Sequence, residues 1–459
     1  MEHVSHKLKN AFEGALAGGG DPATSPLYVF GPFLKMLAAA GVAAITYGDS
    51  IWLVIITIAA VSAVYRYVMR WITDGSGGSG LCEDEFGKWA VKINAALTFV
   101  EDALTFLVSM SALVTFLADR FPLMHAHIIG LPISTLTAIS LSLMIGFLVN
   151  RGPRLASRVF GPATAGVLLL LWMMIIAAIA KTGFHLPPLT LRGFSPGYLH
   201  YTISGYVRIL AVMTGIEVFA NLVAAYSGTD QEKTRKAFGS LSIIMATTIV
   251  TMLIVGPAIF SLADPANVQV SVFTQAMDQL LPQPIAYFGS FVSIIVLMSA
   301  CAASAQGLQH LSSGLAKRRY LPHNFGKTNR FGVADKPVWL QVLISSLSYL
   351  TIGTNEETYL GLYAVGVFVI LSLTAWAVFK RLSPRAWSQL TLKRVAVLLG
   401  IIIAALLTTT ATLVIFIERF LEGAWLYFIL IPILFLVFTH YYTRNSRTAL
   451  TIGTDPAEI

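Results

Sequence analysis

Long apolar runs recur along the whole chain, and they constrain its fold more than any other feature of the sequence. A helix of about 18 or more apolar residues crosses the ~30 Å hydrocarbon core of a bilayer. Twelve such spans are predicted, centred near residues 25, 60, 103, 138, 167, 215, 248, 298, 346, 369, 406 and 433. Only 12% of the residues are charged, whereas soluble domains carry about 25%. The sequence therefore predicts an all-α polytopic membrane protein, with one transmembrane domain over residues 1–443 and a short cytoplasmic tail over 444–459.

Basic residues are distributed unevenly between the two sets of connecting segments. If the N-terminus is cytoplasmic, the segments on that side hold 24 of the 31 Lys and Arg residues, whereas the outer loops hold Arg120, Lys181, Arg192 and Arg419. The positive-inside rule predicts this bias when both termini lie in the cytoplasm. One inner segment carries the run "DGSGGSG" (74–80), which is expected to be a linker or a re-entrant segment. The net charge of +8 is thus a topological signal, and no nucleic-acid partner is expected.

A glycine-rich stretch interrupts the first predicted span. The stretch "AGGGDPATSPLYVFGPFL" (17–34) brings three glycines, Asp21 and Pro22 about halfway along that span. Span 6 carries a second interruption at Thr214 and Gly215. Corresponding interruptions in the two halves of a sequence are typical of transporters built from inverted repeats, whose binding site lies at the bilayer midplane.

The first interruption is rich in oxygen atoms. A helix break frees backbone carbonyls, which cannot stay without partners in lipid, and Thr24, Ser25 and Tyr28 add hydroxyl groups. The Asp21 carboxylate adds one negative charge. Because hard cations prefer oxygen ligands, these groups predict a site for a small monovalent cation. The alternative is a Gly/Pro kink whose aspartate snorkels to the interface, but Asp21 lies too deep in the span for that.

Four carboxylates fall within the predicted spans: Asp21, Glu101, Asp102 and Glu217. Ionisable residues at such positions are costly and mark functional sites by default. Asp102 projects about 100° away from Glu101 on the same helix, either towards a water pathway or towards an adjacent span. Glu217 follows Thr214 by close to one helical turn. It is either a proton carrier or a neutral, structural group that hydrogen-bonds the first interruption. Glu217 and Asp102 are the candidates for proton coupling.

Motifs along the chain resemble two groups of potassium transporters. The motif "GDPATSPLYVF" resembles the G-D-x-x-T-S-P-L-Y signature of the Kup/HAK/KT potassium uptake family. The KimA-type potassium importers are similar at "TFVEDALTFLVSMSA" in span 3, "TGIEVFANLVAAY" in span 6, "GLAKRRYLPHNF" after span 8 and "LYAVGVF" in span 10. Both groups belong to the amino acid–polyamine–organocation superfamily. The resemblance implies the LeuT-type fold, with broken helices 1 and 6. Its inverted five-helix repeats would cover about residues 10–181 and 200–380, and two further helices about 394–443.

The resemblance also implies a potassium site. Carried over position by position, the potassium-binding residues of the KimA-type importers fall on Asp21, Tyr28, Glu101, Thr105, Thr214 and Tyr363. The ion itself is expected at the oxygens of Asp21, Tyr28, Glu101 and Thr214. Glu101 departs from the KimA pattern, which has aspartate there, and agrees with the Kup pattern. Both groups form homodimers to which a larger C-terminal cytosolic domain contributes. Here only 16 residues follow residue 443, so a homodimer stays open.

The sequence favours a transporter over an enzyme or a channel. It contains no H-E-x-x-H, P-loop or G-x-S-x-G motif and no T-V-G-Y-G filter. The first hypothesis is a secondary active potassium importer of the cell membrane, a K⁺/H⁺ symporter that works by alternating access. Its partners would be potassium and membrane lipid, with no cofactor. The alternative is an amino acid or polyamine permease of the same superfamily. Asp21 would repel the carboxylate of an amino acid, whereas an amine would fit.

Reporter fusions test the predicted topology. Reporters fused at residues 232 and 455 are both expected to give a cytoplasmic signal, because the basic segments lie on that side. A periplasmic signal from either fusion would overturn the assignment.

Overall fold

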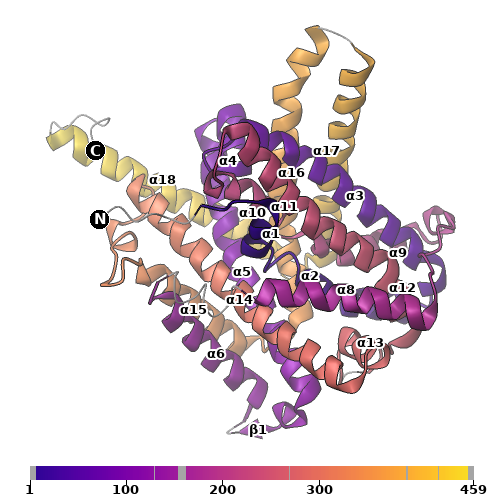
Figure 1. Ribbon diagram of the computed structural model, residues 1–459. Coiled ribbons are helices and arrows are strands. Elements are labelled where there is room, and N and C mark those ends of the chain that lie inside the picture. Colours follow the sequence, from indigo (N-terminus) through magenta and orange to yellow (C-terminus); the bar gives the residue numbers. More distant parts are fainter. Residues whose placement is uncertain are drawn as a thin grey trace.

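The computed structural model describes residues 7–128, 130–152, 162–267, 269–388, 391–421 and 423–452, and most of them are helical (Figure 1). The first half contains α1 (Ala11–Gly18), α2 (Ser25–Ala39), α3 (Ala43–Trp71), α4 (Gly77–Phe86), α5 (Lys88–Arg120), α6 (Ile133–Val149) and α8 (Ala163–Thr182). The second half contains α9 (Leu199–Ile209), α10 (Ile216–Asn221), α11 (Asp230–Val250), α12 (Gly256–Leu262), α13 (Val272–Leu280), α14 (Gln283–Lys317), α15 (Asp335–Thr351), α16 (Glu356–Ser388), α17 (Leu392–Arg419) and α18 (Tyr427–Ile452). Strands β1 (His127–Ile128) and β2 (Leu131–Pro132) form one short antiparallel hairpin, in which His127 pairs with Pro132.

Nine helical segments among the described residues are long and apolar enough to cross a membrane. They are Ala43–Trp71, Lys88–Arg120, Ala163–Thr182, Leu199–Ala225, Asp230–Leu262, Gln283–Lys317, Glu356–Pro384, Arg394–Arg419 and Ala424–Arg444. The chain is therefore polytopic, as predicted. The spans expected near residues 138 and 346 coincide with α6 and α15, helices of 17 residues each, and the span expected near residue 25 is divided between α1 and α2. The count of twelve spans stays a prediction.

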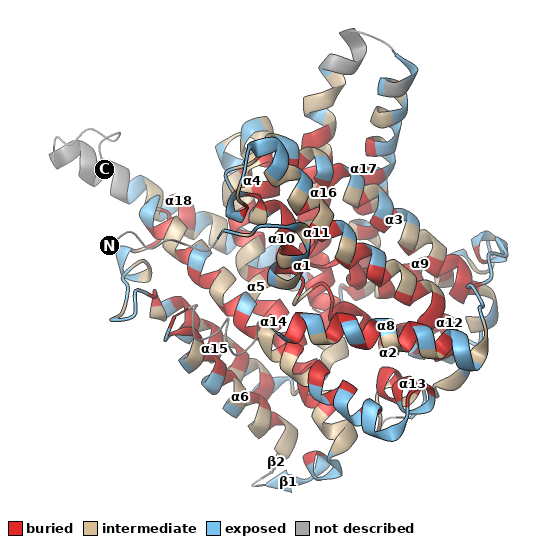
Figure 2. Ribbon diagram, in the orientation of Figure 1, coloured by how far each residue is buried: buried red, intermediate tan, exposed pale blue. Residues whose placement is uncertain are grey.

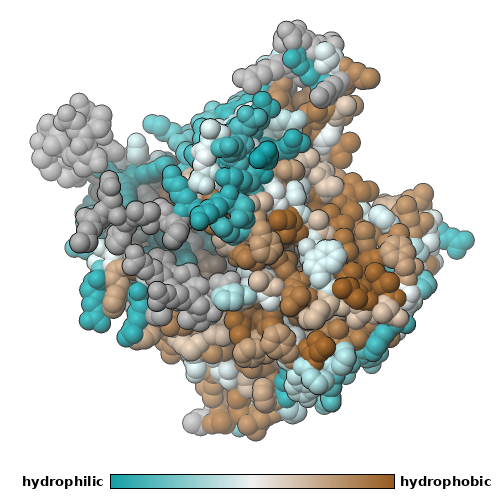
Figure 3. Space-filling model, viewed as in Figure 1, coloured by the Kyte–Doolittle hydropathy of each residue, from teal (hydrophilic) through white to brown (hydrophobic). Residues whose placement is uncertain are grey.

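The long helices pack around α5. Helices α14 and α16 both run along α5, while α6 pairs with α15 and α17 pairs with α16. Helix α4 lies toward the upper left of the bundle in Figure 1, whereas the β1–β2 hairpin lies at the bottom and α13 at the lower right. We call these the α4 end and the α13 end of the bundle. Exposed residues gather at both ends (Figure 2), and a broad apolar surface separates the hydrophilic residues over α4 from those near α13 (Figure 3).

The Gly/Ser run at 74–80 does not form a loose linker. Its last four residues are the first turn of α4, and Gly77 and Gly78 are buried. The Asp74 carboxylate accepts hydrogen bonds from the Ser76 backbone N–H at 2.9 Å and from the Ser76 hydroxyl at 2.6 Å. These bonds hold the pKa of Asp74 below its ordinary value. The turn before α4 is thereby fixed, and α4 packs against α3, α5, α10 and α16.

Candidate functional site

The first interruption separates α1 from α2. Glycine is a poor helix former, and Pro22 lacks the backbone N–H that a continuous helix would need. Helix α1 ends at Gly18, and α2 begins at Ser25 with Pro26 in its first turn. Between them, the Thr24 hydroxyl donates to the Asp21 backbone carbonyl at 2.7 Å. The side chain of Asp21 thus lies on an irregular segment between two helices.

The second interruption faces the first. Helix α9 ends at Ile209, a 3₁₀ turn follows over Leu210–Met213, and α10 begins at Ile216. Gly215 has φ of +82°, which glycine adopts most readily. A Cβ at Gly215 would lie 2.8 Å from the Pro22 ring. The two interruptions therefore touch, and they do so where only a glycine fits.

Hydroxyl groups from both interruptions meet at this contact. The Ser25 hydroxyl lies 3.0 Å from the Thr214 hydroxyl and 3.3 Å from the Tyr28 hydroxyl. All three residues are buried. From α16, the Tyr363 hydroxyl donates to Asp21 Oδ2 at 3.4 Å. Asp21 Oδ1 is buried and has no hydrogen-bond partner within the part of the chain that is described. Four of the six predicted ligands, together with Ser25, are thus gathered at one place.

The remaining two predicted ligands come from α5. Glu101 and Thr105 are both buried, and the Thr105 hydroxyl donates to the Glu101 backbone carbonyl at 2.9 Å. The Glu101 carboxyl lies within hydrogen-bonding range of the Glu217 carboxyl and is close enough to Asp21 for their charges to interact. Two facing carboxylates repel each other unless a proton or a cation lies between them. Glu217 Oε2 is also buried and unpaired among the described residues.

Asp102 lies beside α14 and is close enough to Glu217 and Asp21 for their charges to interact. The Ser304 hydroxyl donates to the Asp102 backbone carbonyl at 3.0 Å. A Cβ at Gly307 would lie 2.6 Å from Asp102 Oδ1, so the carboxylate fills the space beside that glycine. Asp102 Oδ2 is buried and makes no hydrogen bond within the described chain. Asp102 thus packs against α14, and its role in a water pathway or in proton coupling stays a prediction.

The chemistry of the site is that of oxygen ligands with few charges. No group of three or more His, Cys, Asp or Glu side chains suited to a metal ion occurs among the described residues. The gathered groups are instead hydroxyls, the Asp21 carboxylate and the facing carboxyls of Glu101 and Glu217. Such a set suits a monovalent cation or an amine rather than an anion.

Comparison with known proteins gives the family. The family model described as "Amino acid permease" matches residues 17–443. The chain belongs to the amino acid permease family. This permease is also 21% identical over 453 residues to "Potassium transporter KimA" of Bacillus subtilis (strain 168), an alignment that covers 96% of this chain and 72% of that protein. It is accordingly a multi-pass membrane transporter and not an enzyme.

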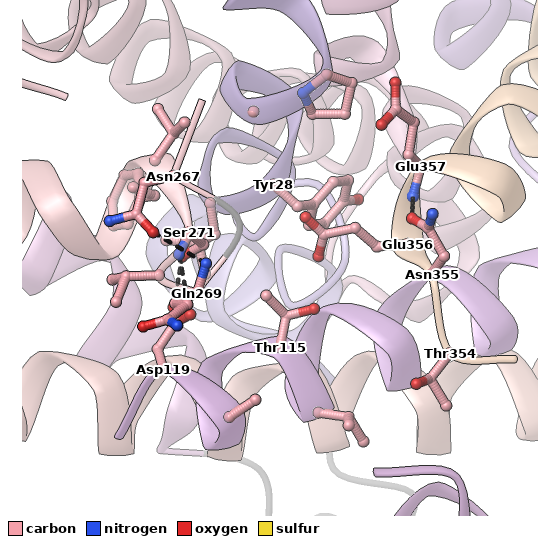
Figure 4. A pocket seen from close by; sticks show the side chains of 18 of the residues that line it. Tyr28, Thr115, Asp119, Asn267, Gln269, Ser271, Thr354, Asn355, Glu356 and Glu357 are labelled. Carbon is pink, nitrogen blue, oxygen red and sulfur yellow. Dashed lines mark hydrogen bonds between the residues drawn. The ribbon is translucent and has the colours of Figure 1, made fainter. Parts of the chain in front are cut away.

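A cavity at the α13 end, which we call the outer cavity, was not predicted from the sequence. It has a volume of about 430 Å³, and Tyr28 is one of its lining residues (Figure 4). It is lined by several charged side chains: Lys35, Asp119, Glu356 and Glu357. Asp119 is held by Ser271, whose backbone N–H and hydroxyl donate to it at 2.9 and 2.5 Å. These residues lie near helix ends, where charged residues are common, so the sequence carries no signal that distinguishes them.

Asp49 of α3 is a fully buried carboxylate that was not predicted from the sequence. It accepts hydrogen bonds from the backbone N–H groups of Thr190, Leu191 and Gly193 at 3.1, 3.2 and 2.8 Å. Asp49 thereby ties the segment between α8 and α9 to α3. Because its oxygens are fully used, it has a structural role.

The contact between Gly215 and Pro22 predicts a large effect of one methyl group. Gly215→Ala would strain a backbone with positive φ and press on the Pro22 ring, so we expect a loss of about 1–3 kcal/mol in unfolding free energy and loss of transport. Gly314→Ala is the matched control, because a Cβ there meets nothing within 4 Å and α14 continues through it. That variant should be as stable as the parent or up to about 1 kcal/mol more stable. Thermal unfolding of the purified protein in detergent measures both, and equal midpoints would contradict the contact.

Proposed function

We propose that this permease is a secondary active potassium importer, in which potassium binds at the oxygens of Asp21, Tyr28, Glu101, Thr105, Thr214 and Tyr363. The observation that carries the proposal is the carboxylate of Asp21, buried beside a cluster of hydroxyls where the two interruptions meet. One carboxylate balances one monovalent cation, and the hydroxyls can replace its water ligands.

The relative with potassium in its name supports the same assignment. KimA of Bacillus subtilis aligns over nearly the whole chain, although at low identity. We further propose the LeuT-type arrangement for this chain, with twelve spans, broken helices 1 and 6 and cytoplasmic termini. The paired interruptions at α1–α2 and α9–α10 support it.

The second candidate is an amino acid or polyamine permease, which the family model favours by its description. An amino acid needs donors for its carboxylate, whereas Asp21 has an unpaired oxygen acceptor at this place. An amine would instead find the carboxylate and hydroxyls favourable. Within this alternative, a polyamine is therefore a better candidate substrate than an amino acid.

An uptake assay with purified, reconstituted protein distinguishes these candidates. We expect accumulation of rubidium or potassium under an inside-negative potential, and no accumulation of spermidine or of an amino acid mixture. A potential of 100 mV supplies about 2.3 kcal/mol per charge. Asp21→Asn should reduce cation uptake about tenfold or more, because it removes the charge that balances the desolvated ion. Parent-like uptake by Asp21→Asn, or uptake of spermidine alone, would refute the potassium site.

We also propose that Glu217 carries the coupled proton. Its carboxyl faces that of Glu101, so a proton and a cation are alternative ways to relieve their repulsion. In Glu217→Gln, residual uptake should lose its dependence on an imposed pH gradient, while uptake driven by the membrane potential persists. Rates measured with each gradient alone test this. Glu232→Gln is the control, since glutamine can keep the capping box of α11. Parent-like proton dependence in Glu217→Gln would move the role to Glu101 or Asp102.

A further inference from the structure

Helix α4 closes one end of the bundle. It packs against α3, α5, α10 and α16, and its face towards them consists of Gly77, Gly78, Leu81 and Cys82, all buried. A Cβ at Gly78 would lie 2.6 Å from the Thr374 hydroxyl, and one at Gly77 would collide with the Asn221 side chain. The small residues thus allow α4 to seal the space between α10 and α16.

Where α4 packs against its neighbours lies a group of polar side chains, one of them on α4 itself, that are buried and poorly paired. We call Tyr65, Cys82, Asn94 and Thr374 the inner polar cluster. The Tyr65 hydroxyl and the Cys82 thiol both approach Thr374, and Cys82 also approaches Asn94. Nevertheless, the Tyr65 hydroxyl, the Thr374 hydroxyl and both amide atoms of Asn94 have no aligned hydrogen-bond partner in the described chain. Asn94 is 1% exposed, and Tyr65 is fully buried.

Such a cluster needs an explanation, because nearly all buried polar groups in folded proteins are paired. Each unpaired group costs about 1–3 kcal/mol. A site that offers several polar partners in one place can hold water or an ion. The Tyr65 hydroxyl, the Thr374 hydroxyl and the Asn94 amide oxygen together supply neutral oxygen ligands, the type that a partly hydrated monovalent cation accepts.

The cluster continues the candidate site towards α4. Tyr65 lies close enough to both Glu217 and Glu101 for their charges to interact with it. Asn94 precedes Glu101 by seven residues on α5, which is two helical turns and about 10 Å along the same face. The inner polar cluster therefore lies between the carboxyl pair and α4. On the opposite side, the outer cavity reaches Tyr28 from the α13 end.

Ion pairs fasten α4 to the end of α16. Arg381 Nε lies 2.6 Å from Glu85 Oε1, and Arg381 Nη2 lies 2.8 Å from Asp84 Oδ2. Lys380 donates to the Glu85 backbone carbonyl. The Arg381 guanidinium also lies over the Trp71 ring of α3, 5.4 Å from its centroid. Arg381 of α16 thus contacts both α3 and α4.

We propose that the inner polar cluster is the release path of the transported cation, and that α4 is its gate, latched by Arg381. In this structure the outer cavity leads to the site and the gate is closed. The ion would leave the Glu101–Glu217 pair, pass the oxygens of the cluster and exit when α4 moves away from Asn221 and Thr374. The identity of the cargo rests on the proposed function, whereas the gate does not depend on it.

Cys82 offers a natural reporter of the gate, because it is fully buried under α4. The full chain with Cys301→Ser would carry Cys82 as its only cysteine. The rate of Cys82 modification is measured with a membrane-impermeant maleimide added on the α4 side of reconstituted vesicles. We expect Cys82 to be modified slowly in the Cys301→Ser protein, which is the parent for this experiment. Adding Arg381→Gln should raise the modification rate about tenfold or more. Exchanging the charges, with Arg381→Glu and Glu85→Arg together, should slow the reaction again.

Arg235→Gln is the matched control, since it removes the same charge from an exposed position on α11, away from the cavity that Arg381 and Glu85 line. Its labelling rate should equal that of the parent. Equal rates for Arg381→Gln and the parent would overturn the latch. Fast labelling of the parent, without any added cargo, would show that α4 is not a closed gate.

The release path is tested by Asn94→Leu and Thr374→Val, which keep side-chain size and remove the polar atoms. Both should reduce the maximal uptake rate about tenfold while leaving the apparent KM from the α13 side unchanged, because the outer cavity is untouched. Thermal unfolding confirms that the variants fold. Uptake at the parent rate by both variants would overturn the path. If Arg381→Gln raises the rate of Cys82 modification although neither potassium nor rubidium is taken up, that result would support the gate and refute potassium as the cargo.

Discussion

The contact between the two chain interruptions is the constraint on which the rest of the structure depends. Pro22 lies against Gly215, whose missing side chain and positive φ allow the two segments to meet. Lipid offers no hydrogen bonds to freed backbone groups, so segments of this kind are stable only when they are buried against protein. The hydrogen bonds between Ser25 and Thr214 and between Tyr363 and Asp21 provide some of the polar contacts that lipid cannot offer. Helices α5 and α16 then enclose the site.

Five carboxylates inside this bundle fall into two groups with different physical roles. Asp49 and Asp119 have hydrogen-bond donors from neighbouring loops, which fixes local structure. Asp21, Asp102 and Glu217 each keep one buried oxygen without a partner among the described residues. An unpaired buried acceptor is destabilising, and departures of this kind from a consistent fold are expected at functional sites. The second group is therefore the one at which the proposed cation and proton would bind.

The two ends of the bundle are not equivalent. At the α13 end, a cavity descends to Tyr28 between α2, α5 and α16. At the α4 end, a glycine-rich helix closes the bundle and is fastened by ion pairs at its outer surface. A transporter needs a barrier on at least one side of its site at any time, and the gate that we propose at α4 would be that barrier here. Residues 74–80 were predicted to be a linker or a re-entrant segment, because the hydropathy of Gly and Ser does not distinguish a buried segment from an exposed one. Their burial follows from the fit of small residues beside Thr374 and Asn221, which depends on helices distant in the sequence.

The sequence by itself determined the polytopic helical class, the places of the two interruptions and four carboxylates that fall within the predicted spans. Hydropathy, glycine and proline act locally, so these features can be read from neighbouring residues alone. Asp21 and Tyr28 could be assigned to one cation site from the residues around the first interruption, whereas Tyr363 could be added to it only through resemblance to known transporters. Tertiary structure alone decided that Glu101 faces Glu217, that Asp102 lies beside Gly307, that Asp49 is an anchor and that Asn94 and Thr374 meet under α4. These relations join residues on different helices, and their distances follow from how the helices pack rather than from any periodicity along the chain.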